Sequence, residues 1–229
     1  MTKDLKNNIL AVDTSSPELK LGLSFGEDRI IQSCERVDKS HSRLIIKKIG
    51  ELFQSAGLHK NELEAIVICT GPGSFTGMRI GLAAAKGMAV ALDIPIVGVN
   101  LFEVAANILS YVNQKVYVII GLNRDQCFVA PVEGGSYDKD AISIISYNNL
   151  LQTIGRNSVA GLGIDLSKHF PKLNNVNLSQ RLEYDASALL HLGAQKLALG
   201  LSNDIVQLEP LYLQKSQAEI RFEQRQREQ

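Results

Sequence analysis

Residues 64–99 restrict the possible folds of this chain more than any other segment. A short continuous apolar run at 64–70 leads into the glycine-rich sequence GPGSFTG at 71–77, then into an alanine- and glycine-rich stretch at 78–92, and an apolar run returns at 96–99. Short apolar runs bounded by turn residues predict buried strands, and the stretch between them predicts a helix that Asp93 and Pro95 end. The order strand, loop, helix, strand is typical of a parallel crossover. The sequence therefore predicts an α/β fold.

The residues before this segment predict three strands and a helix. Apolar positions alternate or run together, with polar or glycine turns between them, at 8–12, 19–25 and 29–34. Apolar residues then recur at spacings of three and four over 44–56, which predicts an amphipathic helix that Ser40 or Ser42 can cap and Gly57 can end.

The second half of the chain repeats this order. Strands are predicted at 116–122, 127–132, 142–145 and 158–163, and helices at 101–110, at 146–154 and from Asp185 to Gly200. A chain of 229 residues with 45% hydrophobic and 21% charged residues is long enough for two lobes. We place the first lobe at 1–105, the second at 106–213 and a polar tail at 214–229.

Charge and cysteine content exclude several classes of protein. The 24 basic and 24 acidic residues balance, so the chain does not bind nucleic acid through bulk charge. Three cysteines without CxxC spacing indicate a reducing compartment, and we expect a cytoplasmic protein. The start of the chain lacks the apolar core of a signal peptide. The apolar stretch 80–99 contains Lys86, Asp93 and Pro95, so we expect no membrane span.

Two loops have the composition of a phosphate site. The first combines a carboxylate with hydroxyls and turn N–H groups, which can hold a phosphate or a hydrated cation, or can form an ordinary turn. The second combines three glycines with a helix start, which suits a bound anion or, equally, close packing of the helix on its sheet. Neither is a Walker loop or a GxGxxG fingerprint. The residues are Asp13, Thr14 and Ser15, and Gly71, Gly73, Ser74, Thr76 and Gly77.

The helix at 78–92 carries small residues at a spacing of four, namely Gly81, Ala85 and Ala89. Such a stripe allows another helix to approach closely, or allows the helix to pack on its own sheet. Met78 and Met88 can add adaptable contact surface or belong to the core.

The sequence predicts neither a metal site nor a nucleophilic hydrolase. No two of the four histidines lie three or four residues apart, and no GxSxG sequence or catalytic cysteine context occurs.

The sequence GPGSFTGMRIG at 71–81 resembles the TsaB (YeaZ) family, as do ILAVDTSS at 9–16, HSRLIIKKIGELFQSAGL at 41–58 and IPIVGVNLFEVAA at 94–106. The resemblance covers most of the first lobe. It is looser in the second lobe, where Asn123, Arg124 and Asp125 replace an Asp-Ala-Arg type turn and Gln214 replaces the arginine of a Tyr-Leu-Arg ending.

This resemblance implies a two-lobed fold of the actin, Hsp70 and sugar kinase type, with mixed sheets flanked by helices. It also implies a role in adding threonylcarbamoyl to the adenine beside the tRNA anticodon in bacteria. The catalytic relative TsaD carries a His-x-x-x-His metal pair, and Leu101 and Ala105 stand at those positions here while Glu103 remains. Since leucine and alanine cannot bind a metal, we expect a catalytically silent subunit.

The implied partners are a TsaD-like catalytic subunit, the ATPase TsaE and, for the isolated chain, a second copy of itself. We expect tRNA contact only through the complex, no cofactor or metal in this subunit, and ATP and a metal in the partners. The expected partner or dimer interface lies on the two first-lobe helices, at His41, Ile45, Lys48, Ile49, Met78, Gly81, Leu82, Ala85, Met88 and Ala89.

Two other functions fit the fold. One is an active ATP-dependent phosphotransferase in which Asp13 and the 71–77 loop handle phosphates, although the second lobe offers only the sequence GLGID at 161–165 toward a nucleotide site. The other is a metallopeptidase, against which the missing histidine pair counts directly.

Overall fold

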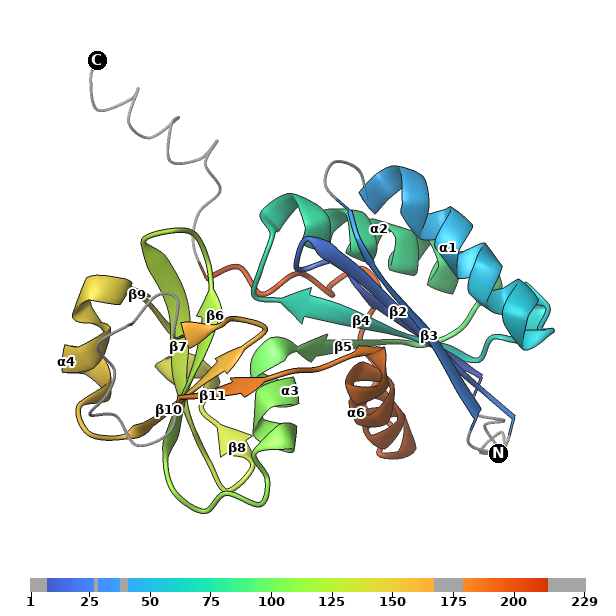
Figure 1. Cartoon of the computed structure of the whole chain (residues 1–229). Coiled ribbons are helices and arrows are strands. Elements are labelled where there is room, and N and C mark those ends of the chain that lie inside the picture. Colours follow the sequence, from blue (N-terminus) through green and yellow to red (C-terminus); the bar gives the residue numbers. More distant parts are fainter. Residues whose placement is uncertain (1–7, 27–28, 38–40, 167–178, 214–229) are drawn as a thin grey trace.

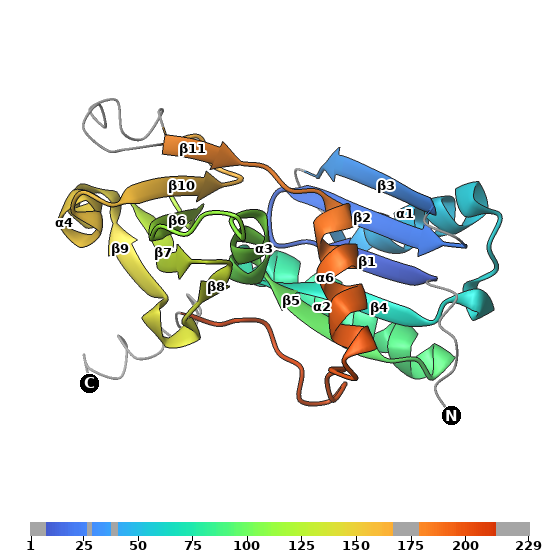
Figure 2. The ribbon, with the colours of Figure 1, turned by 90° about the horizontal axis from the view of Figure 1, so that it is seen from below.

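The computed structural model describes residues 8–26, 29–37, 41–166 and 179–213. Two β-sheets lie next to each other along the long axis of the molecule, each with helices packed on it (Figure 1). The view in Figure 2 shows α6 lying across the first sheet, while α3 lies between the two sheets. The predicted two-lobed α/β fold with mixed sheets is confirmed.

The first sheet has the strand order β3-β2-β1-β4-β5. β1 and β2 pair antiparallel, as do β2 and β3, whereas β1, β4 and β5 run parallel. The three N-terminal strands and the parallel pair were both predicted, because alternating and continuous apolar runs lie where the strands form. The bounds are β1 (Ile9–Asp13), β2 (Glu18–Phe25), β3 (Arg29–Arg36), β4 (Ala65–Gly71) and β5 (Ile96–Asn100).

The helices α1 (His41–Ala56) and α2 (Phe75–Leu92) pack on one face of this sheet. α2 begins three residues before its predicted start, because the Ser74 side chain caps it by accepting the N–H of Gly77 at 3.1 Å. It ends at Asp93, which has a φ of 52°. α1 is followed by Gly57, whose φ of 68° suits the end of a helix.

The second sheet repeats the strand order of the first. β6, β7 and β9 form an antiparallel series, and β10 and β11 extend the sheet in parallel from β6. β8 adds a short pairing to β7. The predicted repeat of element order is confirmed, with β6 in the place of β1. The bounds are β6 (Val116–Gly121), β7 (Gln126–Glu133), β8 (Ser136–Tyr137), β9 (Ser143–Ser146), β10 (Ser158–Leu162), β11 (Ser179–Leu182), α3 (Leu101–Ile108), α4 (Leu150–Ile154) and α6 (Ala186–Ala198).

Strand β1 supplies the core on both faces of the first sheet. Leu10 and Val12 face α1 and α2, while Ile9 and Ala11 belong to a second cluster that includes α3, α6 and the near face of the second sheet. This alternation follows from the period of two in a strand. Since this second cluster draws residues from both sheets, it joins the two lobes.

Helix α6 packs on the first sheet although we assigned its residues to the second lobe. Gly22 of β2 and Gly193 of α6 allow this close packing, because a Cβ at Gly193 would lie 2.1 Å from the Val67 side chain and one at Gly22 would lie 2.8 Å from Ala186. The lobe division at 105 and 213 stays a prediction. The predicted polar tail lies outside the described residues.

Candidate functional site

The two loops proposed for phosphate binding lie against each other. They follow β1 and β4, which are parallel neighbours, so both loops emerge at the same edge of the sheet. The hydroxyl of Thr14 donates to the carbonyl of Gly77 at 2.7 Å, and the N–H of Ser74 donates to the carbonyl of Ser15 at 2.6 Å. Asp13, Thr14 and Ser15 are buried. The two loops therefore form one junction whose residues are in contact.

The glycines of the second loop are required for this contact. A Cβ at Gly73 would lie 2.2 Å from the carbonyl oxygen of Ser15, and one at Gly77 would lie 2.1 Å from that of Thr14. A Cβ at Gly81 would lie 2.2 Å from the Thr14 hydroxyl oxygen. These are backbone or buried atoms that cannot move away, so the glycines serve close packing of α2 on β1.

The carboxyl group of Asp13 is held on both oxygens. The N–H of Ser15 donates to Oδ1 at 2.8 Å, and the hydroxyl of Tyr184 donates to Oδ2 at 2.8 Å. Lys20 Nζ lies 4.5 Å from the centre of the Tyr184 ring. Sequence reasoning missed Tyr184, because it lies 171 residues from Asp13, between β11 and α6, in no motif that points to β1.

Several of the polar groups that a phosphate or a cation would need are already bound within the protein. The N–H groups of Ser74 and Gly77 donate hydrogen bonds to oxygens of the protein. Both oxygens of the Asp13 carboxyl accept hydrogen bonds from the protein. The geometry therefore favours the alternative given for each loop, which is a turn closed by the Ser15 N–H on Asp13 for the first and close packing of α2 on its sheet for the second. Within the 71–77 loop the exposed residues are Ser74 and Thr76.

The Tyr184→Phe substitution tests the buried hydrogen bond to Asp13. It removes only the hydroxyl and leaves a buried carboxyl with one donor fewer, so we expect a loss of about 1–3 kcal/mol in the free energy of unfolding at pH 7. Urea unfolding of the two proteins measures this loss. Equal stabilities would show that water replaces the hydroxyl.

The same bond predicts a dependence on alkaline pH. Burial, and next the charge of Asp13, raise the pKa of the Tyr184 hydroxyl well above its usual range. A raised folded-state pKa means that the stabilisation is complete below about pH 10, the ordinary tyrosine pKa, and is lost as the pH rises above it. Wild type should therefore lose stability above this pH more steeply than Tyr184→Phe. Tyr137 and Tyr147, whose pKa values burial also raises, occur in both proteins.

The positions that the resemblance assigns to metal-binding histidines belong to the core here. Leu101 and Ala105 of α3 are buried and pack in the cluster shared by the two lobes. The Glu103 carboxylate is bound by Lys196 Nζ at 2.8 and 2.9 Å and accepts the N–H of Asn100 at 3.0 Å. The described part of the chain has no group of three metal-binding side chains. Glu103 joins α3 to α6, which is a structural role.

Most of the residues expected at a partner interface are buried inside this chain, and this part of the prediction is wrong. They fill the space between α1, α2 and the sheet, and Ala85 is only 1% exposed. Met88 is partly buried against the same cluster. The Lys48 ammonium lies 2.7 Å from Glu35 and 3.1 Å from Glu51. Nothing is described of the His41 side chain. The buried residues are Ile45, Ile49, Met78, Gly81, Leu82, Ala85 and Ala89.

A different face of the same two helices is exposed. Ile46 is 58% exposed and Val90 65% exposed, and no atom lies within 4 Å of a Cβ built at Gly50 or Gly87. Together with the exposed Ala83, these residues form what we call the docking face: Ile46 and Gly50 on α1, and Ala83, Gly87 and Val90 on α2. The predicted helices were therefore right, but the small residues that face outward lie two positions further along α2 than expected.

Helix α2 has the length and the mean hydropathy, 1.2, of a membrane span, and among the described residues it is the one helix that does. Core helices of soluble proteins pass the same test. Here α2 is packed on β4 and α1, and its uncovered side carries Arg79 and small residues. We therefore interpret it as a core helix of the first lobe.

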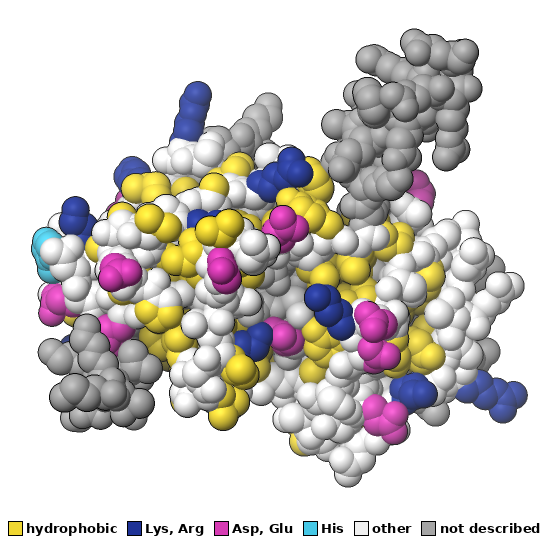
Figure 3. Space-filling view, turned by 180° about the vertical axis from the view of Figure 1, so that it is seen from behind, with side chains coloured by type: hydrophobic (Ala, Val, Ile, Leu, Met, Phe, Trp, Pro, Cys, Tyr) yellow, Lys and Arg dark blue, Asp and Glu magenta, His cyan; other side chains and the backbone are white. Residues whose placement is uncertain are grey.

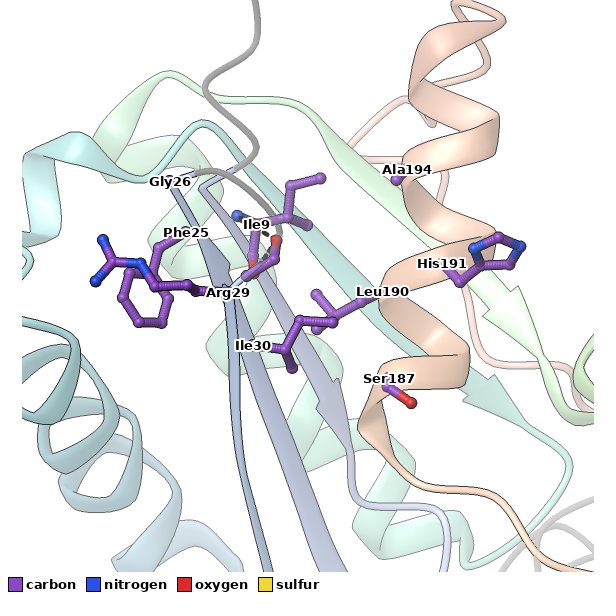
Figure 4. Close-up of a pocket in the computed structure, with 10 residues that line it drawn as sticks. Ile9, Phe25, Gly26, Arg29, Ile30, Ser187, Leu190, His191 and Ala194 are labelled. Atoms are coloured by element: carbon purple, nitrogen blue, oxygen red, sulfur yellow. Dashed lines mark hydrogen bonds between the residues drawn. The ribbon is translucent and has the colours of Figure 1, made fainter.

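A small cavity lies on the opposite face of the sheet, between the β1–β3 meander and α6 (Figure 4). Its volume is about 220 Å³ and its walls are mainly aliphatic, from Ile9, Ile30 and Leu190. The guanidinium of Arg29 lies 4.4 Å from the Phe25 ring centre, and His191 hydrogen-bonds Gln195 at 2.9 Å. Among the described residues that line it, no set of reactive groups converges on this cavity.

Residues 123–125, which differ from the Asp-Ala-Arg type turn of the TsaB family, form a turn that is closed by its own hydrogen bonds. Asn123 Oδ1 accepts the N–H groups of Asp125 and Gln126 at 2.8 and 2.9 Å, which closes the connection between β6 and β7. Gln214 lies outside the described residues. The sequence of this loop therefore differs from the family pattern, while the hairpin of β6 and β7 remains closed.

Comparison with known proteins supports the resemblance. The family "TsaD: tRNA N6-adenosine threonylcarbamoyltransferase" matches residues 33–222. The chain is 27% identical over 227 residues to the tRNA threonylcarbamoyladenosine biosynthesis protein TsaB of Bacillus subtilis, covering 93% of this chain and 97% of that protein. It is 30% identical over 116 residues to TsaB of Haemophilus influenzae, covering 50% and 48%.

The fold agrees with a solved structure. YeaZ from Pseudomonas aeruginosa superposes with a TM-score of 0.68 at 22% identity, covering 90% of this chain and 99% of that one. The extent of the family match, together with the nearly full-length match to TsaB of Bacillus subtilis, shows that the chain belongs to the tRNA N6-adenosine threonylcarbamoyltransferase (TsaD) family and to its TsaB (YeaZ) group.

Proposed function

We propose that this chain is a non-catalytic subunit in the biosynthesis of threonylcarbamoyladenosine in bacterial tRNA. The observation that carries the proposal is the match to TsaB of Bacillus subtilis over nearly the full length of both proteins. The local structure agrees with a silent role, because Leu101 and Ala105 are core residues and the loops after β1 and β4 bind each other. A cytoplasmic location belongs to the same proposal.

The docking face is the surface through which we expect this subunit to act. Small residues at Ala83 and Gly87 allow the helices of a TsaD-like catalytic subunit to approach closely, and Ile46 and Val90 supply apolar area at the same place. A supporting subunit can raise the rate of its partner by holding the reacting groups in position. In the absence of that partner, the same face can pair two copies of this chain about a two-fold axis.

The remaining partners follow from the same role. We place a TsaE-like ATPase at the seam between the two subunits, with ATP and the catalytic metal bound by the partners, and tRNA bound by the complex. The balanced charge of this chain supports the last point. The closed junction at Asp13 argues against an active phosphotransferase.

Reconstitution of the modification tests this function. The reaction would contain tRNA, ATP, threonine, bicarbonate, the threonylcarbamoyl-AMP synthase, TsaD and TsaE from one bacterium, with or without this protein. We expect modified adenosine to form at least about tenfold faster with it, and a heterodimer with TsaD to elute in size-exclusion chromatography. Modification at the same rate without this protein, and no heterodimer, would refute the proposal.

A further inference from the structure

An exposed arginine in the first turns of α2 packs against a pair of aromatic rings that contact each other. The Arg79 guanidinium lies 3.9 Å from the centre of the Phe75 ring and 5.5 Å from that of Tyr212. The two rings lie 4.9 Å apart, and Arg79 Nε donates to the Tyr212 hydroxyl at 2.9 Å. Arginine side chains on a surface normally sample many rotamers, so this one has already lost much of its conformational freedom.

Tyr212 reaches this position because residues 203–213, which we call the strap, run along β5 at the edge of the first sheet and then beside α2. Figures 1 and 2 show this segment running from the end of α6 toward the second sheet. It is tied at three points: Asn203 N–H donates to Ile96, Lys86 Nζ donates to the Val206 carbonyl at 3.1 Å, and Leu211 N–H donates to Thr70 at 2.8 Å. The strap therefore holds Tyr212 against α2 through backbone hydrogen bonds.

The charge of Arg79 is not neutralised by any carboxylate in the part of the chain that the structure describes. Of its five N–H donors only Nε–H forms a hydrogen bond to those residues. The strap carries two exposed acids, but Asp204 Oδ1 accepts the N–H groups of Val206 and Gln207, and Glu209 forms no ion pair with Arg79. A fixed cation with free donors is suited to a planar, charged acceptor.

Arg79 lies at one end of the docking face. Arg79, Ala83, Gly87 and Val90 follow one another at spacings of four, four and three residues, which places all four on one side of α2. All four are exposed. The strap lies beside the same side of the helix, since Lys86 and Arg79 both bind it. Figure 3 shows the molecule from behind the view in Figure 1. On this face, hydrophobic side chains are interspersed with scattered charges of both signs, and the charges form no continuous basic surface.

We propose that Arg79, held by Phe75 and Tyr212, is a preformed anchor for an aspartate or glutamate side chain of the catalytic partner subunit. This inference rests on the proposed function. Arginine and tyrosine are among the residues most enriched at the energetic centres of protein interfaces, and an arginine that is already ordered loses little conformational entropy on binding. The local charge favours a single carboxylate over an RNA backbone, because Asp204 and Glu209 lie on the same strap and the chain has no basic excess.

The test compares the same substitution at two exposed arginines, one at the proposed anchor and one in the second lobe. Arg79→Gln removes the anchor, and Arg156→Gln removes an exposed arginine from the second lobe. Dissociation constants of each variant with the TsaD-like subunit are measured by titration calorimetry at about 0.05 M and 0.5 M salt. We expect Arg79→Gln to weaken binding about tenfold or more at low salt, with a smaller gap at high salt, and Arg156→Gln to stay within about twofold of wild type. Arg79→Lys should fall between wild type and Arg79→Gln, since lysine keeps the charge without the planar fork.

The possible results separate this inference from the proposed function. A wild-type protein that forms no heterodimer overturns both. A heterodimer in which Arg79→Gln binds as tightly as Arg156→Gln overturns the anchor alone. If Arg79→Gln leaves heterodimer affinity intact but weakens tRNA binding by the assembled complex, the acceptor is an RNA phosphate and the carboxylate proposal is wrong. Thermal melting of each variant checks that folding is unchanged.

Discussion

The Ala85→Arg variant is expected not to fold. Ala85 is 1% exposed and lies in the cluster between α2, α1 and the first sheet, with Leu82 and Ile45. An arginine there forces a charged group and five N–H donors into a space without acceptors. The cost of such a buried, unpaired charge is about 3–5 kcal/mol or more, which approaches the whole stability of a typical domain. Soluble yield, circular dichroism and thermal melting measure the outcome.

Gly87→Arg is the matched control for this substitution, two residues further along the same helix. Nothing lies within 4 Å of a Cβ at Gly87, so the new side chain can extend into solvent. Replacing glycine in a helix interior also gains up to about 1 kcal/mol of helix propensity. We expect Gly87→Arg to fold normally and to lose association with the catalytic partner and with itself. A folded Ala85→Arg variant beside an unfolded Gly87→Arg would reverse the assignment of the two faces of α2.

The Gly77→Ala variant is expected to lose about 2–3 kcal/mol in the free energy of unfolding. Gly77 has an ordinary helical backbone, so the loss comes from contact rather than from backbone strain. Its Cβ would lie 2.1 Å from the carbonyl oxygen of Thr14, which β1 holds in place. To make room, α2 must move away from β1 and weaken the hydrogen bond from Thr14 to the Gly77 carbonyl. Urea unfolding gives the difference.

The same glycine-to-alanine change at Gly50 is expected to raise the free energy of unfolding rather than lower it. Gly50 lies within α1 and no atom lies within 4 Å of a Cβ at this position. Alanine there should stabilise the protein by about 0.5–1 kcal/mol, because it restricts the unfolded chain more than glycine does. If Gly77→Ala proved as stable as wild type, the two loops would have to separate in solution, and a phosphate site at Asp13 would again be possible.

The sequence by itself determined the elements and their order. The apolar runs at 64–70 and 96–99 became the parallel strands β4 and β5, and the alternation at 19–25 became the antiparallel β2. Capping residues marked helix ends, as Asp93 and Asp185 did. These features are local, because the periodicity of apolar residues and the chemistry of turns act over a few residues. For the same reason the repeat of strand order in the two halves was visible.

The tertiary structure alone decided which face of each helix is covered and which distant residues meet. Small residues occur on both sides of α2, so composition could not distinguish the buried Ala85 from the exposed Gly87, whereas the position of α1 and of the sheet does. Tyr184 closes the Asp13 junction and Tyr212 fixes Arg79 across separations of 171 and 133 residues. Contacts of this kind depend on how α6 and the strap return to the first sheet, and that path is set by packing between elements, not by any local pattern.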